Sequence, residues 1–104
     1  MARIAFRMQV KPGKLEEYIA HHRAVWPELL DDLRAAGYRD YSIFHDGNDL
    51  FAVLECDDWE AANARLAGSD ANRRWQAFMH DYLEQQVDAE TGPTRLMPEI
   101  FRLD

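Results

Sequence analysis

The chain has little cysteine and no long apolar run. Its single cysteine, Cys56, has no partner for an internal disulfide, and it lies in an alternating, strand-like run. A buried, reduced thiol is therefore expected, as in a cytoplasmic protein. No segment approaches the roughly 18 apolar residues that a membrane span needs, and the N-terminus lacks the apolar core and cleavage site of a signal peptide. The sequence predicts a soluble, cytoplasmic protein that does not associate with a membrane.

Positive charge is also scarce. Twelve Lys and Arg residues stand against 19 Asp and Glu residues, which gives a formal net charge of -7. Such a surface repels phosphate groups, so nucleic acids are excluded as partners. The sequence has no glycine-rich phosphate loop and no nucleophile elbow, and its four histidines lack the tight spacing of metal ligands. No metal site is expected, and small neutral ligands or protein partners remain.

The period of the apolar pattern changes along the chain and indicates the order of the elements. Strands are expected at 3–10, 38–44, 49–56 and 97–104, and helical regions at 14–36, 59–68 and 69–86. Pro27 should kink the first helical region or start a second segment after Trp26, whereas Gly68 should break the later region. The segment 45–48 has the composition of a tight hairpin turn, and 87–96 is expected to be a loose connection.

This order of strand, helix, strand, strand, helix, strand is the ferredoxin-like βαββαβ unit. We therefore expect one α+β domain over residues 1–104, with a four-stranded antiparallel sheet and the helices on one face. The other face would carry apolar residues from alternating strand positions. A second copy would cover them, so a homodimer of the dimeric α+β barrel type is predicted.

Two adjacent histidines lie in the stretch "YIAHHRAVWPEL", residues 18 to 29. At 100° per residue, His22 falls at the centre of the apolar stripe of a helix, whereas His21 falls about 100° away and is expected to be solvated and chemically idle. Tyr18, His22 and Trp26 are spaced four residues apart, which predicts a column on one helix face.

This column has two interpretations. In the first, it is ordinary core packing. In the second, His22 borders a cavity, because a buried imidazole needs partners for both nitrogens, and a cavity that is polar at a histidine and aromatic at its rim suits a sugar. By spacing alone Trp75 and Phe78 are typical of a core, and the pattern does not decide which face of the sheet Tyr41 occupies.

The sequence resembles the L-rhamnose mutarotases over nearly its whole length. The resemblance rests on "FRMQVKPGKLEEY", "DYSIF", "NRRWQAFM", "EIFRLD" and, most specifically, the Tyr-x-x-x-His-x-x-x-Trp-Pro-Glu spacing of residues 18 to 28. It implies a dimeric ferredoxin-like fold and an isomerase that interconverts the α and β anomers of a 6-deoxy sugar without a cofactor. It also implies that His22 is the proton donor and that Tyr18, Tyr41 and Trp75 contact the sugar.

Two departures from the family concern the expected site. Gln76 stands where the best-known members have a second tryptophan, and "DAETGP" replaces their run before the last strand. We expect Gln76 and Trp26 to border the sugar, and we expect the Gln76 amide to restrict the range of sugars that the protein accepts. Alternatively, Gln76 is exposed and has no part in substrate choice.

L-fucose is the competing sugar, because related proteins that act on it look like this chain around "HHRAVWPE". A non-catalytic small-ligand-binding module and a cofactor-independent oxygenase on the same fold are the alternatives from other classes.

Overall fold

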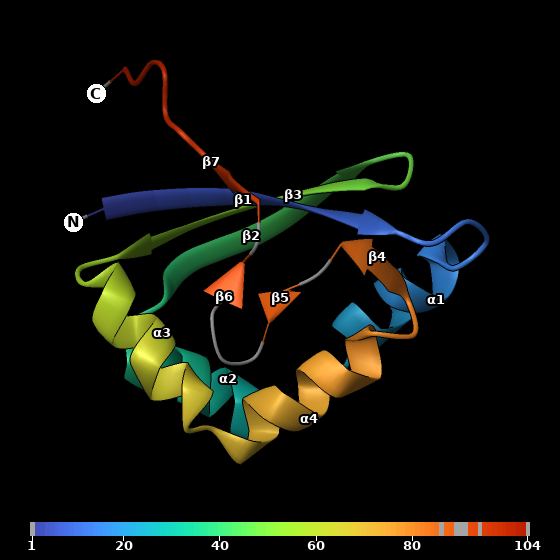
Figure 1. The fold of residues 1–104 in the computed structure, drawn as a ribbon, viewed down its shortest axis with the longest axis horizontal. Coiled ribbons are helices and arrows are strands. Elements are labelled where there is room, and N and C mark those ends of the chain that lie inside the picture. Colours follow the sequence, from blue (N-terminus) through green and yellow to red (C-terminus); the bar gives the residue numbers. More distant parts are fainter. Residues whose placement is uncertain (1, 86, 89–91, 94, 104) are drawn as a thin grey trace.

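The computed structural model describes residues 2–85, 87–88, 92–93 and 95–103, in which a β-sheet is covered by helices on one side (Figure 1). The strands are β1 (Ala2–Val10), β2 (Arg39–Asp46), β3 (Asp49–Cys56), β4 (Leu83–Gln85), β5 (Val87–Asp88), β6 (Gly92–Pro93) and β7 (Leu96–Met97). The helices are α1 (Leu15–His22), α2 (Pro27–Ala36), α3 (Trp59–Ala67) and α4 (Asp70–Met79). Across the described residues, none of these helices has the length and apolar character required to cross a bilayer.

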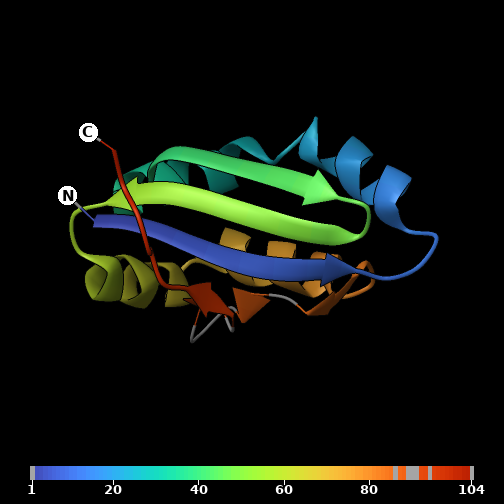
Figure 2. The same ribbon diagram turned by 90° about the horizontal axis from the view of Figure 1, so that it is seen from above.

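The sheet confirms the predicted ferredoxin-like α+β fold. Its strands are antiparallel in the order β2-β3-β1-β4, and β7 pairs with another part of β1. Seen from above, the helices lie behind the strands, so the opposite face of the sheet is left open (Figure 2). The small β5–β6 pair lies beside the β1 edge of the sheet, at a height between the sheet and the helices (Figures 1 and 2).

The hydrophobic core lies between the sheet and the helices. Alternate residues of β1 and β3 point into it, as the period of two predicts: Phe6, Met8, Val10, Leu50, Ala52, Leu54 and Cys56. Cys56 is 1% exposed, which confirms the predicted buried thiol. The hairpin between β2 and β3 turns at Gly47, whose φ of 59° is readily adopted by glycine.

The first helical region divides at Pro27, which confirms the expected alternative of a second segment after Trp26. Helix α1 ends at His22, and α2 starts with Pro27 at its first position, where a missing backbone N–H costs no hydrogen bond. Gly37 ends α2 in the left-handed conformation with φ of 101°. The interruption near Gly68 is also confirmed, and Ser69 then caps α4 by accepting a hydrogen bond from the backbone N–H of Asn72.

The C-terminal part differs from the prediction in two places. The helix expected to extend to residue 86 ends at Met79, because the chain turns and the backbone N–H of Lys11 donates to the carbonyl of Tyr82 at 2.8 Å. Leu83 is then buried in β4 beside Val10. The strand expected at 97–104 was also wrong, since β7 ends at Met97 and residues 98–103 form a tail without regular structure that leaves the sheet on its open side (Figure 1).

Candidate active site

A pocket of about 360 Å³ opens between the helices and the sheet. Four of the predicted site residues line it, and they come from three distant parts of the chain: His22 from α1, Tyr41 from β2, and Trp75 and Gln76 from α4. The remaining lining residues are Phe6, Val25, Leu29, Leu30, Leu33, Tyr38, Ile43, Asn63, Leu66, Asn72, Gly92 and Pro93. The pocket is thus largely apolar with a few polar groups, as is typical of small-molecule sites.

The orientation of the His22 ring follows from one hydrogen bond. Nδ1 lies 2.9 Å from the backbone carbonyl oxygen of Tyr18, and a carbonyl oxygen only accepts, so Nδ1 carries the hydrogen and donates it. The ring is also held between aromatic neighbours, with centroids 4.2 Å from Tyr18 and 5.4 Å from Trp75. Nε2 is consequently the ring nitrogen left to meet a ligand.

The electrostatic surroundings keep His22 neutral. Burial lowers the pKa of His22; the hydrogen bond to the Tyr18 carbonyl opposes this shift, and the neighbouring His21 adds to it. Near neutral pH the imidazole is therefore uncharged, and Nε2 carries a lone pair. An imidazole of this kind can take up a proton and then return it.

Three tyrosines near His22 are neutral and can donate hydrogen bonds. Burial raises the pKa of Tyr18 and Tyr38, and the charge that Tyr41 would carry raises the pKa of both further. Tyr41 is 36% exposed, but desolvation of its hydroxyl raises its pKa as well. Tyr38 and Tyr41 line the pocket, with ring centroids 5.5 Å apart. Tyr18 is 4% exposed and does not line the pocket, because it lies against the His22 ring.

Strand β2 has an irregularity next to Tyr41. Arg39 pairs with Glu55 and Ser42 with Val53, so two residues of β2, Asp40 and Tyr41, stand opposite a single residue of β3. This is a β-bulge, and Asp40 adopts a φ of 49° within it. Beyond the bulge the strand alternates regularly, so Tyr41 shares the face of Ile43, which pairs with the buried Ala52, and both line the pocket. The alternating pattern of the sequence alone left this face undecided.

The predictions for Trp26 and His21 need correction. Because α1 ends at His22, Trp26 is not on the third turn of the same helix, and the predicted column stops after two residues. Trp26 packs edge-on against Trp75 at 5.0 Å and is absent from the pocket lining. His21 is half-buried and has partners of its own: Nε2 lies 3.1 Å from the hydroxyl of Tyr82, and the ring contacts Phe78 at 4.6 Å.

Sequence reasoning missed Tyr38 and two asparagines, Asn63 and Asn72, in the pocket wall. Asparagine is a poor residue for a helix interior, so these two carried a signal that was not used. Gln76 lies at the pocket as expected and donates from Nε2 to Oδ1 of Asn72 at 3.2 Å. The altered segment "DAETGP" contributes Gly92 with its neighbouring proline, whereas residues 89–91 of that segment lie outside the described part.

Within the described residues, no three His, Cys, Asp or Glu side chains are grouped so that they could hold a metal ion.

The comparisons with known proteins agree with one another. The family model described as L-rhamnose mutarotase matches residues 3–103. The chain is 45% identical over 106 aligned positions to an L-rhamnose mutarotase of Burkholderia ambifaria, with 100% of both chains covered. It is 41% identical to an L-rhamnose mutarotase of Sinorhizobium fredii over 86% of this chain and 88% of the other. The crystal structure of an L-rhamnose mutarotase from Formosa agariphila superposes with a TM-score of 0.83 at 28% identity, covering 100% of each chain.

Proposed function

The chain belongs to the L-rhamnose mutarotase family, and from this premise we propose that it interconverts the α and β anomers of L-rhamnose with His22 as the proton-transferring residue. It is an isomerase, and its substrate is a 6-deoxy pyranose. One observation supports the assignment of His22 above the others: Nδ1 is held by the Tyr18 carbonyl, so Nε2 is the nitrogen available to a ligand in the pocket.

The reaction needs one proton to move between two oxygens on the same carbon. Ring opening breaks the bond between C1 and the ring oxygen, while the anomeric hydroxyl loses its proton to become the aldehyde oxygen and the ring oxygen gains one. Nε2 of neutral His22 accepts the proton from the anomeric hydroxyl and then donates it to the ring oxygen. His22 is in this sense the proton donor, and the proton that it donates comes from the substrate itself, which suits its lowered pKa.

Ring closure runs the same steps in reverse. After rotation about the bond between C1 and C2, the former ring hydroxyl attacks the other face of the aldehyde, which inverts C1. Trp75 offers an aromatic face to the C–H groups of the sugar, and Tyr41, held neutral by its surroundings, offers a hydroxyl donor. Tyr18 acts through His22, whose ring it fixes, and Trp26 acts through Trp75.

Saturation-transfer NMR tests this function. Irradiation of the anomeric proton of α-L-rhamnose should reduce the β signal faster with protein than without it, and L-rhamnose should exchange faster than L-fucose. Binding of L-rhamnose without faster exchange would instead indicate a binding module. Faster exchange of L-fucose would reverse the order of the two sugars.

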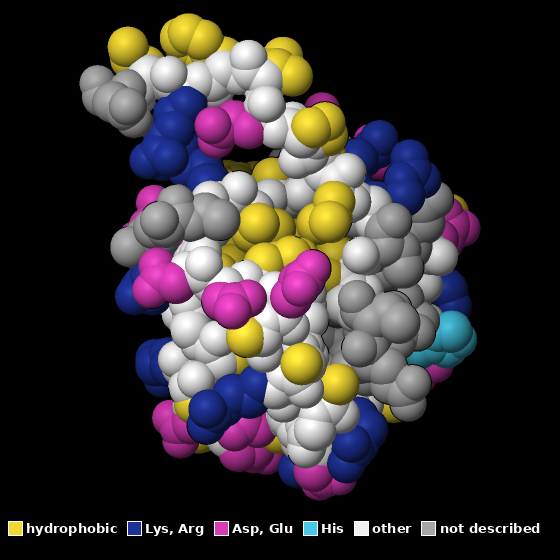
Figure 3. Space-filling model, turned by 60° about the vertical axis from the view of Figure 1, so that its left-hand side comes forward, with side chains coloured by type: hydrophobic (Ala, Val, Ile, Leu, Met, Phe, Trp, Pro, Cys, Tyr) yellow, Lys and Arg dark blue, Asp and Glu magenta, His cyan; other side chains and the backbone are white. Residues whose placement is uncertain are grey.

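A homodimer that covers the open face of the sheet is part of the proposal. Because side chains alternate along a strand, Phe44, Phe51 and Val53 point away from the core and lie on this face. Phe44 is 61% exposed. The tail beyond β7 adds three exposed apolar side chains, Ile100, Phe101 and Leu103. Hydrophobic side chains stand out on the segment that projects at the top of Figure 3. A second copy that covers both would remove this apolar surface from water.

Light scattering of the purified chain tests the dimer. The expected mass is twice that of one chain, and removal of residues 98–104 should shift the protein toward the monomer. A monomeric full-length chain would contradict the proposal. We further propose that the 104 residues act as one domain in the cytoplasm, in accord with their lone, buried cysteine.

A further inference from the structure

A buried amide forms part of the pocket wall. Asn72 is 5% exposed, and among the described residues it is the one buried amide. It lies on α4, one turn before Gln76, and both side chains line the pocket. Burial of an amide is costly unless its groups are hydrogen-bonded, so its partners are informative.

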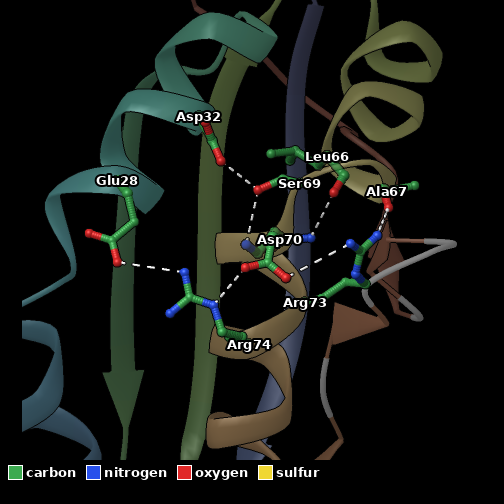
Figure 4. A network of polar contacts seen from close by, with 9 residues as sticks. Glu28, Asp32, Leu66, Ala67, Ser69, Asp70, Arg73 and Arg74 are labelled. Atoms are coloured by element: carbon green, nitrogen blue, oxygen red, sulfur yellow. Dashed lines mark hydrogen bonds and ion pairs between the residues drawn. The ribbon is translucent and has the colours of Figure 1, made fainter.

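The partners of Asn72 fix which way its amide points. Nδ2 lies 3.3 Å from the backbone carbonyl oxygen of Leu66, at the end of α3. A carbonyl oxygen only accepts, so the NH2 group of Asn72 must face Leu66 and Oδ1 must face the other way. The first turn of α4 is held in place around this bond: Ser69 donates to Asp32 at 2.5 Å, and Arg74 bonds to Asp70 at 2.9 Å (Figure 4).

The orientation of Asn72 then fixes that of Gln76. Oδ1 of Asn72 is 3.2 Å from Nε2 of Gln76, and because Oδ1 only accepts, Gln76 must present its NH2 group to it. Oε1 of Gln76 is therefore turned away from Asn72. In the part of the chain that the structure describes, no hydrogen bond from the protein to this oxygen is found, and Gln76 borders the pocket.

We infer that Asn72 is a positioning residue that presents Oε1 of Gln76 to the pocket as a fixed hydrogen-bond acceptor for one sugar hydroxyl. This inference rests on the proposed function and deepens it by assigning a group that selects the substrate. A glutamine amide without such a neighbour can rotate by 180° and either donate or accept a hydrogen bond. Held in this way, Gln76 favours a sugar whose hydroxyl donates at that point, and it penalises a sugar that lacks this hydroxyl.

The test uses L-rhamnose and its 2-deoxy, 3-deoxy and 4-deoxy derivatives, with kcat/KM measured by anomer exchange. In the wild-type protein, kcat/KM should fall about tenfold more for one of the three deoxy sugars than for the other two, because that sugar leaves Oε1 of Gln76 unpaired. In Gln76→Met, which keeps the length but not the amide, this selective loss should disappear. Ala77→Met changes an exposed neighbour on the same helix and should retain it.

Two substitutions of Asn72 separate positioning from folding. Asn72→Asp keeps an oxygen that accepts from Gln76, so it should retain the selective loss, whereas Asn72→Ala should abolish it. Both remove the bond to Leu66 and weaken the fold. The ratio of kcat/KM for two sugars on one sample does not depend on the folded fraction, so destabilisation does not disturb this comparison.

The outcomes are distinct. If the wild-type protein does not accelerate exchange of L-rhamnose, the proposed function fails. If it does, but Gln76→Met retains the selective loss or no deoxy sugar shows one, Gln76 is not the acceptor. If the two Asn72 variants behave alike, or if Asn72→Ala has no activity at all, Asn72 serves folding and the positioning role is refuted.

Discussion

Replacing His22 by alanine should nearly abolish catalysed anomer exchange. A positioned acid–base group typically contributes about 10²- to 10⁴-fold to the rate, which corresponds to about 3 to 5 kcal/mol of activation free energy. His22→Ala removes Nε2, the nitrogen available for proton transfer, so kcat should fall within this range. Saturation-transfer NMR on equilibrated L-rhamnose measures the change without a coupled assay.

The same substitution also has a cost in stability. It removes the hydrogen bond from Nδ1 to the Tyr18 carbonyl, which contributes about 0.5–1.5 kcal/mol, and the ring contacts with Tyr18 and Trp75. For a chain of this size, a loss of about 1 kcal/mol lowers Tm by about 4–8 °C. Exchange is therefore measured well below the Tm of the variant.

His21→Ala is the matched control. His21 is hydrogen-bonded to Tyr82 and packed on Phe78, so its removal should lower the stability by a similar amount, but it does not line the pocket and the exchange rate should be kept. Added imidazole should partly restore exchange in His22→Ala by occupying the space of the lost ring. Undiminished exchange in His22→Ala, or an equal loss in both variants, would refute the assignment.

Three further predictions concern the pH dependence of catalysis, a glycine at the pocket and the bulge in β2. Because neutral His22 is the active form and burial lowers its pKa, kcat/KM should rise with pH through a midpoint below the ordinary value of about 6.5 and then level off; a fall with rising pH in this range would require the charged form instead. Gly92→Ala should lower the free energy of unfolding, measured by thermal denaturation, by more than Gly13→Ala does. Both glycines have a positive φ, which costs another residue about 1–2 kcal/mol. Only at Gly92 does the new Cβ also approach Asn63 Oδ1, at 2.9 Å. Asp40→Val places a β-branched residue at a φ of 49°, so it should lower Tm and raise KM by displacing the pocket tyrosine that follows it, whereas an unchanged KM would separate the bulge from the site.

Much of the fold could be predicted because local preferences and the apolar pattern agree with it. The alternation in 3–10 marks a strand with one buried face, and Pro27 and Gly68 mark the helix boundaries. The end of α4 could not be predicted, because residues 82–86 are rich in good helix formers. There the pairing of Leu83 with Val10 in the sheet outweighs helix propensity, and this pairing depends on residues distant in the sequence.

The site was predicted best where spacing alone carries the information. Tyr18 and His22 are one helical turn apart, so their contact follows from the period of the helix. The same reasoning was wrong for Trp26, because a period holds only while the helix continues, and α1 ends at His22. Tyr41 could not be assigned to a face, since alternation defines two faces but not which of them meets the helices. Both faces of β2 carry apolar residues, Ile43 on one and Phe44 on the other.

Two residues in or next to the pocket wall depart from the preference of their element. Asp40 adopts a positive φ that costs free energy in a strand, and Asn72 buries an amide in a helix interior, where asparagine is a poor helix former. Each lies beside a residue of the pocket lining: Asp40 precedes Tyr41, and Asn72 accepts a hydrogen bond from Gln76. Such costs are typical of functional sites, which supports the proposal that this cavity is the active site. The proposed selectivity comes from the amide pair, because the ring face of Trp75 has no hydrogen-bond direction, whereas an oriented amide distinguishes sugars that differ in a single hydroxyl.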